Sequence, residues 1–263
     1  MTEINRIRKL FQETKLVTGA HVRTQDPCMS ELIARIGYDI VWVENEHSFL
    51  DKCNTNLHVL AAQAGGAAAV VRVPWNDPVL VKPVLEMGVD GVIFPLIRSA
   101  DDAKRAVEAC MYPPEGIRGF GPIRANQYGL IPTEEYLKTA NQNVFKILQI
   151  EHADAVRDID RILEIPGVDA IVVGQNDLSG SVGKLTKVMD PEIQEMMRTV
   201  FDACKRHNIP GGISSGPSKK EMDMWFGFGI DFIFMPNEFD WVRIGAVNAL
   251  KDIRTYAKEG RLR

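Results

Sequence analysis

The chain has 263 residues, a formal net charge of −4, 45% hydrophobic residues and 25% charged residues, which is typical of a folded protein with one large or two small domains. The acidic balance gives no reason to expect a nucleic acid or an anionic membrane as a partner. No apolar run approaches the roughly 20 residues that span a bilayer. The N-terminal segment lacks the apolar core of a secretory signal, and the four cysteines are too scattered for disulfides or a zinc site. We therefore expect a soluble cytoplasmic protein.

Strand and helix patterns alternate from one end of the chain to the other. The predicted strands are 16–22, 39–47, 67–75, 91–97, 144–151, a run that ends at residue 177, 209–216 and 231–239. The predicted helices are 30–37, 54–64, 78–88, 100–111, the segment between the fifth and sixth strands, 191–207, 218–228 and the amphipathic C-terminal stretch. About eight strand–helix pairs predict a (β/α)8 barrel, with residues 1–263 as a single domain. An open doubly wound sheet is the alternative, but the chain lacks its glycine fingerprint.

The segment 112–132 interrupts this alternation. It reads YPPEGIRGFGPIRANQYGLIP and is rich in Gly, Pro and Arg. Connections of this length are uncommon in compact domains and usually serve a function or an interface. We expect one of these roles for it.

Two carboxylates end the fifth and sixth predicted strands. Glu151 follows Gln149 by two residues and Asp177 follows Gln175 by two, so each pair shares one face of its predicted strand. A strand–helix–strand unit of this length makes the strands parallel, so the two acids would meet at one edge of the sheet. Each acid alone could equally serve a helix start or a turn. Together they predict a site for a hard divalent cation, with positions left for water and substrate.

Arg72 and His47 stand at the ends of two other predicted strands. A buried strand seldom carries an arginine unless its charge is matched. Arg72 is therefore either half of a structural ion pair or a fixed cation that stabilises an oxyanion beside the metal, and we favour the second. His47 lies beside Glu44 and Glu46, and it is either a satisfied polar group or a residue that moves protons. The remaining histidines, with no comparable setting, are His21, His58, His152 and His207.

No lysine is positioned to form a Schiff base with a substrate. Lys146 lies on the opposite face of its predicted strand from Glu151, and Lys184 lies in a loop, so covalent imine chemistry is not expected. Ser214 and Ser215 follow a strand, but without the nucleophile elbow of a serine hydrolase.

The sequence resembles the HpcH/HpaI aldolases, which are metal-dependent (class II) pyruvate aldolases. The segments VENEH, RVPWNDP, YPPEGIRGFG, LQIE and GQNDLSGSVG occur in that order, and the resemblance runs from about Gly19 to the last strand. It implies a (β/α)8 barrel and a divalent metal, Mg²⁺ or Mn²⁺, with Co²⁺ as a third candidate. It also implies a homo-oligomer, typically a hexamer in which the last helix is exchanged between subunits.

The resemblance also implies residue roles. Glu151 and Asp177 would hold the metal, Arg72 would stabilise the pyruvate enolate, and His47, paired with Glu86, would transfer protons. The further residues expected to contact the substrate are Glu44, Gln149, Gln175 and Asn176. The sequence departs from the family pattern at Glu44 and Glu86, where aspartate is usual, at Asn45, and in GQNDLS, where GPxDLS is common. These departures leave open the aldehyde preference and the efficiency of the proton relay.

The expected reaction is the reversible cleavage of a 4-hydroxy-2-oxo acid to pyruvate and an aldehyde through a metal-bound pyruvate enolate. One rival is a metal–enolate lyase acting on a CoA thioester or a phosphoenolpyruvate-type substrate, for which Arg118 and Arg124 are candidate phosphate ligands. Another is a barrel that has lost catalysis and binds a metabolite.

Overall fold

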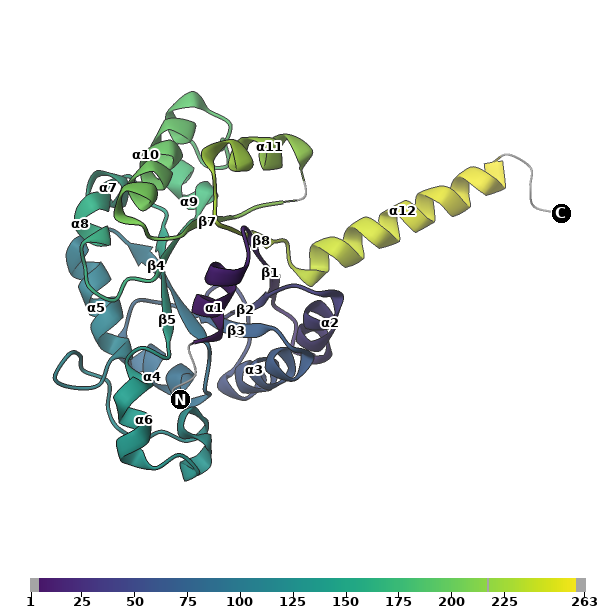
Figure 1. Ribbon diagram of the computed structural model, residues 1–263. Helices are drawn as coiled ribbons and strands as arrows, with labels where there is room; N and C mark the ends of the chain where they lie inside the picture. The colour runs from purple at the N-terminus through teal and green to yellow at the C-terminus, as the bar shows by residue number, and fades with distance from the viewer. Residues whose placement is uncertain (1–4, 217, 259–263) are drawn as a thin grey trace.

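The computed structural model describes residues 5–216 and 218–258. In this part of the chain, eight parallel strands close into a barrel in chain order (Figure 1). The strands are β1 (Val17–Val22), β2 (Ile40–Glu44), β3 (Ala68–Arg72), β4 (Gly91–Ile97), β5 (Phe145–Ile150), β6 (Ala170–Val173), β7 (Gly211–Ser214) and β8 (Phe232–Met235). The predicted (β/α)8 barrel is therefore confirmed. No helix within the described ranges is long and apolar enough to cross a membrane.

Helices connect the strands and surround the barrel (Figure 1). They are α1 (Arg6–Glu13), α2 (Cys28–Ile36), α3 (Lys52–Gly65), α4 (Pro78–Glu86), α5 (Ala100–Cys110), α6 (Thr133–Ala140), α7 (Ala153–Arg157), α8 (Ile159–Leu163), α9 (Gln175–Gly180), α10 (Pro191–His207), α11 (Lys219–Phe228) and α12 (Glu238–Lys258). A 3-10 helix, η1 (Arg124–Gly129), lies within the long segment 112–132.

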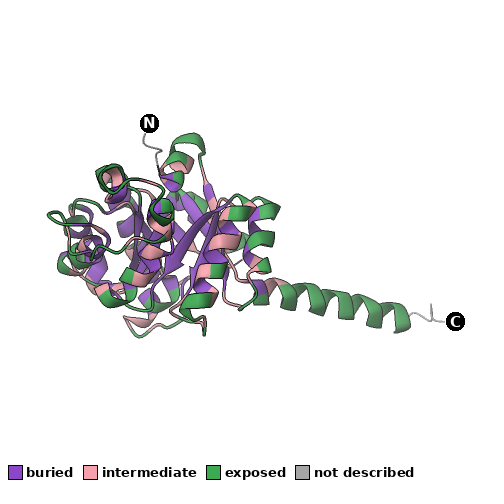
Figure 2. Ribbon diagram, turned by 90° about the horizontal axis from the view of Figure 1, so that it is seen from below, coloured by how far each residue is buried: buried purple, intermediate pink, exposed green. Residues whose placement is uncertain are grey.

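The barrel interior and the layer beneath the helices form two separate cores. Alternate strand residues face inward, and the inner cluster includes Trp42 of β2 and Val70 of β3. The intervening strand residues pack under the helices, so the strands are buried on both faces (Figure 2). Two residues further along, Glu44 and Arg72 are the next inward positions and are register partners. The alternation thus delivers both charged side chains to the carboxyl end of the barrel.

Helix α1 closes the other end of the barrel. Its residue Ile7 belongs to the inner cluster, with Leu10 and Phe11 packed against that cluster. The ring of Phe11 stacks on that of Phe145 with 5.7 Å between centroids. Because this apolar plug fills the amino end of the strands, polar chemistry is confined to the carboxyl end.

Several strands end earlier than the sequence predicts, for identifiable reasons. β2 stops at Glu44 because its carboxylate accepts hydrogen bonds from the backbone N–H groups of Glu46 (2.7 Å) and His47 (3.1 Å), which turns the chain. β6 stops at Val173 because the next residue, Gly174, accepts the first hydrogen bond of α9. β3, β7 and β8 are also shorter than predicted.

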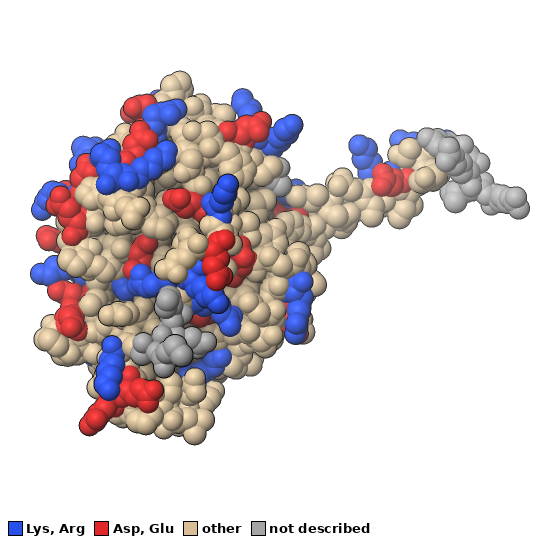
Figure 3. Space-filling model, viewed as in Figure 1, with Lys and Arg blue, Asp and Glu red and all other residues tan. Residues whose placement is uncertain are grey.

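Helix α12 projects away from the barrel (Figures 1 and 2). Along it, Val242, Val247, Leu250 and Ile253 are all exposed, although apolar side chains on one helix usually face a packing partner. Its predicted exchange between subunits stays a prediction. On the face shown in Figure 3, acidic and basic side chains are interspersed over the barrel, with no broad patch of one sign.

Candidate active site

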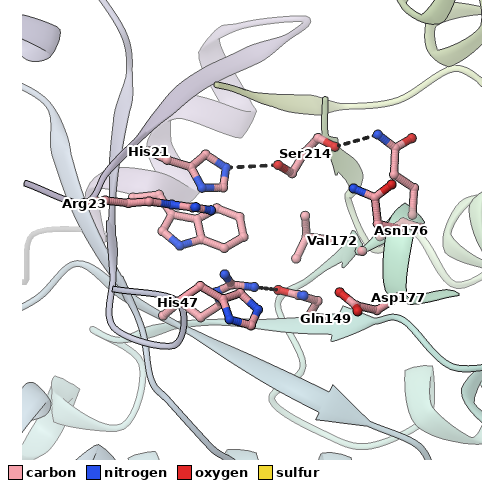
Figure 4. Close-up of a pocket in the computed structure, with 13 residues that line it drawn as sticks. His21, Arg23, His47, Gln149, Val172, Asn176, Asp177 and Ser214 are labelled. Carbon is pink, nitrogen blue, oxygen red and sulfur yellow. Dashed lines mark hydrogen bonds between the residues drawn. The ribbon is translucent and has the colours of Figure 1, made fainter. Parts of the chain in front are cut away.

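A cavity of about 160 Å³ opens at the carboxyl ends of the strands, where TIM-barrel sites lie. Figure 4 shows it from the inside, with the His21–Ser214 pair along the top and His47, Gln149 and Asp177 along the bottom. The lining residues are His21, Arg23, Trp42, His47, Arg72, Gln149, Val172, Val173, Gly174, Gln175, Asn176, Asp177 and Ser214. Most of the predicted site residues therefore come together here.

Arg72 is the hub of the polar network. Its Nε donates to Glu44 Oε1 at 3.0 Å, its Nη2 donates to Glu44 Oε2, and its Nη1 donates to Gln149 Oε1 at 3.1 Å. Nη1 also lies 2.8 Å from Glu46 Oε2. The guanidinium sits 5.0 Å from the ring centroid of Trp42. These contacts hold the cation rigidly at the cavity wall.

Glu44 binds Arg72 on the side of the guanidinium that faces away from the cavity. It is fully buried, and it does not line the cavity. Burial disfavours its charge, but the Coulomb attraction of Arg72 and the hydrogen bonds to the carboxylate outweigh burial and hold the pKa of Glu44 below its usual value. The predicted substrate contact of Glu44 is thus corrected to a positioning role, because Arg72 occupies both of its oxygens.

Gln149 connects Arg72 to the predicted metal ligand Glu151. Its Nε2 donates to Glu151 Oε2, and the backbone N–H of Leu96 donates to Glu151 Oε1 at 2.6 Å. A Cβ on Gly174 would lie 2.8 Å from Glu151 Oε2, so a glycine is needed there to make room for the carboxylate. Burial, together with the nearby charge of Glu46, raises the pKa of Glu151 to about 7.

Asp177 reaches the cavity from a helix, not from a strand as predicted. It lies in the first turn of α9, and the predicted face shared by Val173, Gln175 and Asp177 does not exist because the strand has already ended. Gln175 and Asn176 do line the cavity. Gln175 Nε2 donates to the carbonyl of Ser214 at 3.3 Å, while its buried Oε1 has no partner among the described residues.

Glu46 adds a further acid to this side of the cavity. Burial and the charges of Glu44 and Asp177 raise its pKa to about 7, against the attraction of Arg72. Its Oε2, although near Arg72, is not aligned for a hydrogen bond to any described group. Four carboxylates, those of Glu44, Glu46, Glu151 and Asp177, thus lie on this side of the cavity, and Arg72 pairs directly with only the first two.

This excess of negative charge fits a divalent cation, which would stabilise the charged forms of Glu46 and Glu151 against the burial and the repulsion that raise their pKa values. Glu151 and Asp177 supply oxygen atoms, the ligand type that Mg²⁺ and Mn²⁺ prefer. In the described part of the chain, no group of three or more His, Cys, Asp or Glu side chains is arranged to hold a metal. A cation here would therefore take its other ligands from water and substrate.

His47 lies in the loop after β2, at the rim of the cavity. Its side chain is 58% exposed, and its Nε2 lies 3.8 Å from Glu46 Oε1. Glu86, its predicted partner, instead forms an ion pair with Arg118 at 3.0 Å. The predicted His47–Glu86 pair is therefore not formed within this chain: Glu86 Oε1 pairs with Arg118, and Glu86 Oε2 is buried without a partner among the described residues. The acid beside His47 is Glu46.

The long segment contributes its arginines to structure. Arg118 is buried, paired with Glu86 and stacked 4.5 Å from the ring centroid of Tyr112. Arg124 donates from Nη1 to the carbonyls of Met87 (2.9 Å) and Gly88 (3.3 Å). Neither arginine lines the cavity, so neither is free to bind a substrate phosphate there. The segment instead braces the C-terminal end of α4.

Sequence reasoning missed His21, which lines the cavity from β1. Its Nε2 is 3.0 Å from Ser214 Oγ, and its ring stacks on Trp42 at 4.2 Å between centroids. The signal was present in the sequence, because His21 shares the inward face of its strand with Val17 and Gly19. Lys146 by contrast lies at the amino end of β5, paired with Asp169 at 3.1 Å. Among the described residues no lysine lines the cavity.

Comparison with known proteins identifies the family of this chain. The family model for HpcH/HpaI aldolase/citrate lyase matches residues 18–217. A 5-keto-4-deoxy-D-glucarate aldolase from Salmonella arizonae is 30% identical over 92% of this chain and 93% of its own length. Another from Citrobacter koseri is 31% identical over 87% of this chain and 88% of its own.

Solved structures give the same result. An HpcH/HpaI aldolase/citrate lyase family protein from Burkholderia cenocepacia superposes with a TM-score of 0.89 at 30% identity, covering 95% of this chain and 99% of that one. The HpcH/HpaI aldolase from Desulfitobacterium hafniense gives a TM-score of 0.88 at 27% identity, with coverage of 94% and 96%. The chain therefore belongs to the HpcH/HpaI aldolase/citrate lyase family and is an enzyme of the aldolase and lyase kind.

Proposed function

We propose that this enzyme is a divalent-metal-dependent aldolase that reversibly cleaves a 4-hydroxy-2-oxo acid to pyruvate and an aldehyde. The observation that supports this most strongly is a rigid cation, Arg72, set at the cavity wall beside an excess of carboxylates. Such a wall suits a substrate that develops negative charge on oxygen and that bridges to a bound cation. A divalent cation held by Glu151 and Asp177, when bound, would polarise the 2-keto group as a Lewis acid.

The side chains of this chain divide the remaining work. Arg72 would donate to the oxygen that gains charge as the C3–C4 bond breaks, since its orientation is fixed before the reaction starts. Gln149, which binds both Arg72 and Glu151, would orient the 2-oxo acid between them. Gln175 and Asn176 would contact the substrate from α9.

His47 would accept the proton of the C4 hydroxyl during cleavage and return it during condensation. Its exposure at the rim lets it exchange protons with solvent, and Glu46 beside it would stabilise the imidazolium that forms. A proton from solvent, added to the terminal CH2 carbon of the enolate, then gives pyruvate.

The rival functions fit the cavity less well. A volume of about 160 Å³ suits a small acid, whereas drug-sized ligands occupy roughly 300 Å³ or more. The arginines considered for a phosphate are engaged elsewhere. A non-catalytic metabolite-binding barrel would need no exposed histidine–acid pair at the rim. The relatives named above act on 5-keto-4-deoxy-D-glucarate, and we propose a related hydroxy-oxo acid as the substrate class.

We further propose a homo-oligomer, a hexamer by family resemblance, in which α12 packs on a neighbouring subunit. The support is the row of exposed apolar side chains on a helix that leaves its own barrel. Light scattering of the full chain should give a multiple of the chain mass, and Val247→Glu combined with Ile253→Glu should reduce it. A monomeric wild type would contradict this proposal.

The reaction is tested by incubating the enzyme with pyruvate and a panel of aldehydes, in Mn²⁺ and then in EDTA. Mass spectrometry should detect a product equal in mass to pyruvate plus aldehyde, in the Mn²⁺ sample alone. Absence of any adduct across acidic, neutral and hydroxylated aldehydes would contradict the proposed reaction.

A further inference from the structure

Arg23 is a charged residue of the cavity that the proposed reaction does not use. It follows β1 and lines the cavity (Figure 4). Among the described residues, its guanidinium has no ion pair or hydrogen bond, and its Nε is buried without a partner. Arg23 is half-buried rather than fully buried, but a buried N–H donor without an acceptor costs free energy. Such a cost points to a partner that the protein chain does not supply.

The acid that contacts this loop forms no ion pair with the guanidinium among the described residues, and its Oε2 is buried without a partner. Glu238, at the start of α12, is buried, but its Oε1 accepts from the backbone N–H groups of Arg23 (2.7 Å) and Thr24 (2.5 Å). The carboxylate therefore fixes the backbone of this loop. The guanidinium is left facing the cavity, and the loop that carries it is held in place.

His21 and Ser214 complete a polar wall beside Arg23. Burial lowers the pKa of His21 to about 3 against the attraction of Glu44, and the charges of Arg72 and Arg23 act in the same direction as burial. The ring is thus neutral, and its Nδ1 has no hydrogen bond to the described residues. When Ser214 Oγ donates to Nε2 across their 3.0 Å contact, Nδ1 carries the hydrogen and can donate to an anion.

This wall faces the part of the acidic side that β5 carries, although β1 is also the neighbour of β2, which carries Glu44. β1 and β5 are four positions apart in the closed ring of eight strands, so Arg23 and His21 face the side that holds Gln149 and Glu151. Trp42 lies between the two, with His21 stacked on its ring and Arg72 near the ring centroid. A substrate with its 2-oxo acid at Arg72 would extend its far end toward Arg23.

We propose that Arg23, His21 and Ser214 form a second anion subsite that binds a carboxylate at the end of the substrate remote from the 2-oxo acid. The substrates of this enzyme are then diacids, or pairs of an oxo acid and an aldehyde that together carry two acidic groups. This inference rests on the proposed function for the position of the 2-oxo acid. It adds the specificity that the shared chemistry leaves open.

The test compares matched probes that differ in one carboxylate. Calorimetry with Mn²⁺ present gives the affinities of 2-oxoglutarate and 2-oxopentanoate. Condensation with pyruvate gives kcat/KM for succinic semialdehyde and butanal. In the wild type the acidic probe of at least one pair should be preferred by about 10- to 100-fold, the range expected for a charged hydrogen-bonded contact. The pair that shows the preference identifies which substrate carries the carboxylate.

Arg23→Gln should reduce that preference to within about threefold, while Arg23→Lys should retain part of it because the charge remains. The control is Arg98→Gln, an exposed arginine between β4 and α5, which should keep the wild-type preference. Unchanged thermal unfolding of each variant shows that it folds. Equal affinity for both members of both pairs, or a preference that survives in Arg23→Gln, overturns the subsite. Metal-dependent adduct formation with any aldehyde would still support the proposed aldolase reaction. Failure of the subsite proposal can therefore be told apart from failure of the proposed function.

Discussion

The two sides of the cavity differ in the charge of their unpaired side chains, which is negative on one side and positive on the other. The side built from β2, β3, β5 and α9 holds four carboxylates around one arginine, and burial raises the pKa of both Glu46 and Glu151 to about 7. The side that carries His21 and Ser214 holds Arg23, whose guanidinium is unpaired within the described chain. One side is thus completed by a cation and the other by an anion. The charged side chains of a site that lack a partner in the protein therefore indicate its ligands as directly as the paired ones do.

Removing an acid from the first side should have the largest effect. Asp177→Ala removes a predicted metal ligand, and turnover in Mn²⁺ should fall by about 1,000-fold, in line with the loss of a main electrostatic contribution. Steady-state assays measure the fall. Asp202→Ala, at an exposed position of α10, is the matched control and should retain activity. Equal turnover of the two variants would remove Asp177 from the site.

Changing the hub of the same side should come next. Arg72→Lys keeps the charge but cannot hold Glu44 and Gln149 at once, so kcat should fall by about 100-fold. Urea unfolding should also show a loss of about 1–3 kcal/mol, because buried oxygens lose donors. The exposed Arg198→Lys controls for the substitution itself. Full activity in Arg72→Lys would mean that charge alone matters there.

Glu46 offers a finer probe of the negative excess. Glu46→Gln removes one charge near Glu151 and Asp177, so calorimetry should show Mn²⁺ binding weakened by about 10-fold, the lower end of effects from residues around a metal site. Glu195→Gln, on an exposed stretch of α10, should bind as the wild type does. Tighter binding in Glu46→Gln would contradict the view that this acid helps to attract the cation.

His21 gives the smallest effect, on the pH dependence of stability. The pKa of His21 is about 3 in the folded state, whereas its ordinary value is 6.5. Below pH 6.5, His21 therefore binds a proton in the unfolded chain but stays neutral in the folded chain. Stability is therefore lost as the pH falls from 6.5 toward 3. Between pH 6.5 and 5.5 the wild type should lose about 1 kcal/mol more than His21→Gln, measured by urea unfolding. Equal losses would show that His21 is not a buried neutral ring.

The sequence was sufficient for the barrel and for most of the acidic side of the cavity. The alternation of strands and helices predicted the architecture, and the inward period of two brings Arg72 and Gln149 to the same end of the barrel. The ends of strands were less predictable. The side chain of Glu44 and the carbonyl of Gly174 each accept hydrogen bonds from backbone N–H groups two to four residues further along the chain. The alternation of apolar and polar residues does not show where such a bond ends a strand.

Pairings between distant segments were the least predictable. Glu86 lies 32 residues from Arg118, and only the folded loop shows that these two side chains meet. His21 and Ser214 are 193 residues apart, and each alone looks unremarkable in its strand. The subsite beside Arg23 therefore emerges from closure of the barrel, which brings the first strand near the last two.

The most direct test of the account is the exchange of pyruvate methyl protons with deuterated water, followed by NMR in Mg²⁺ or Mn²⁺ and then in EDTA. It detects enolate formation without requiring the natural aldehyde. We expect exchange that depends on the metal and disappears in Arg72→Ala. Absence of exchange from folded wild-type protein that binds the metal would contradict it.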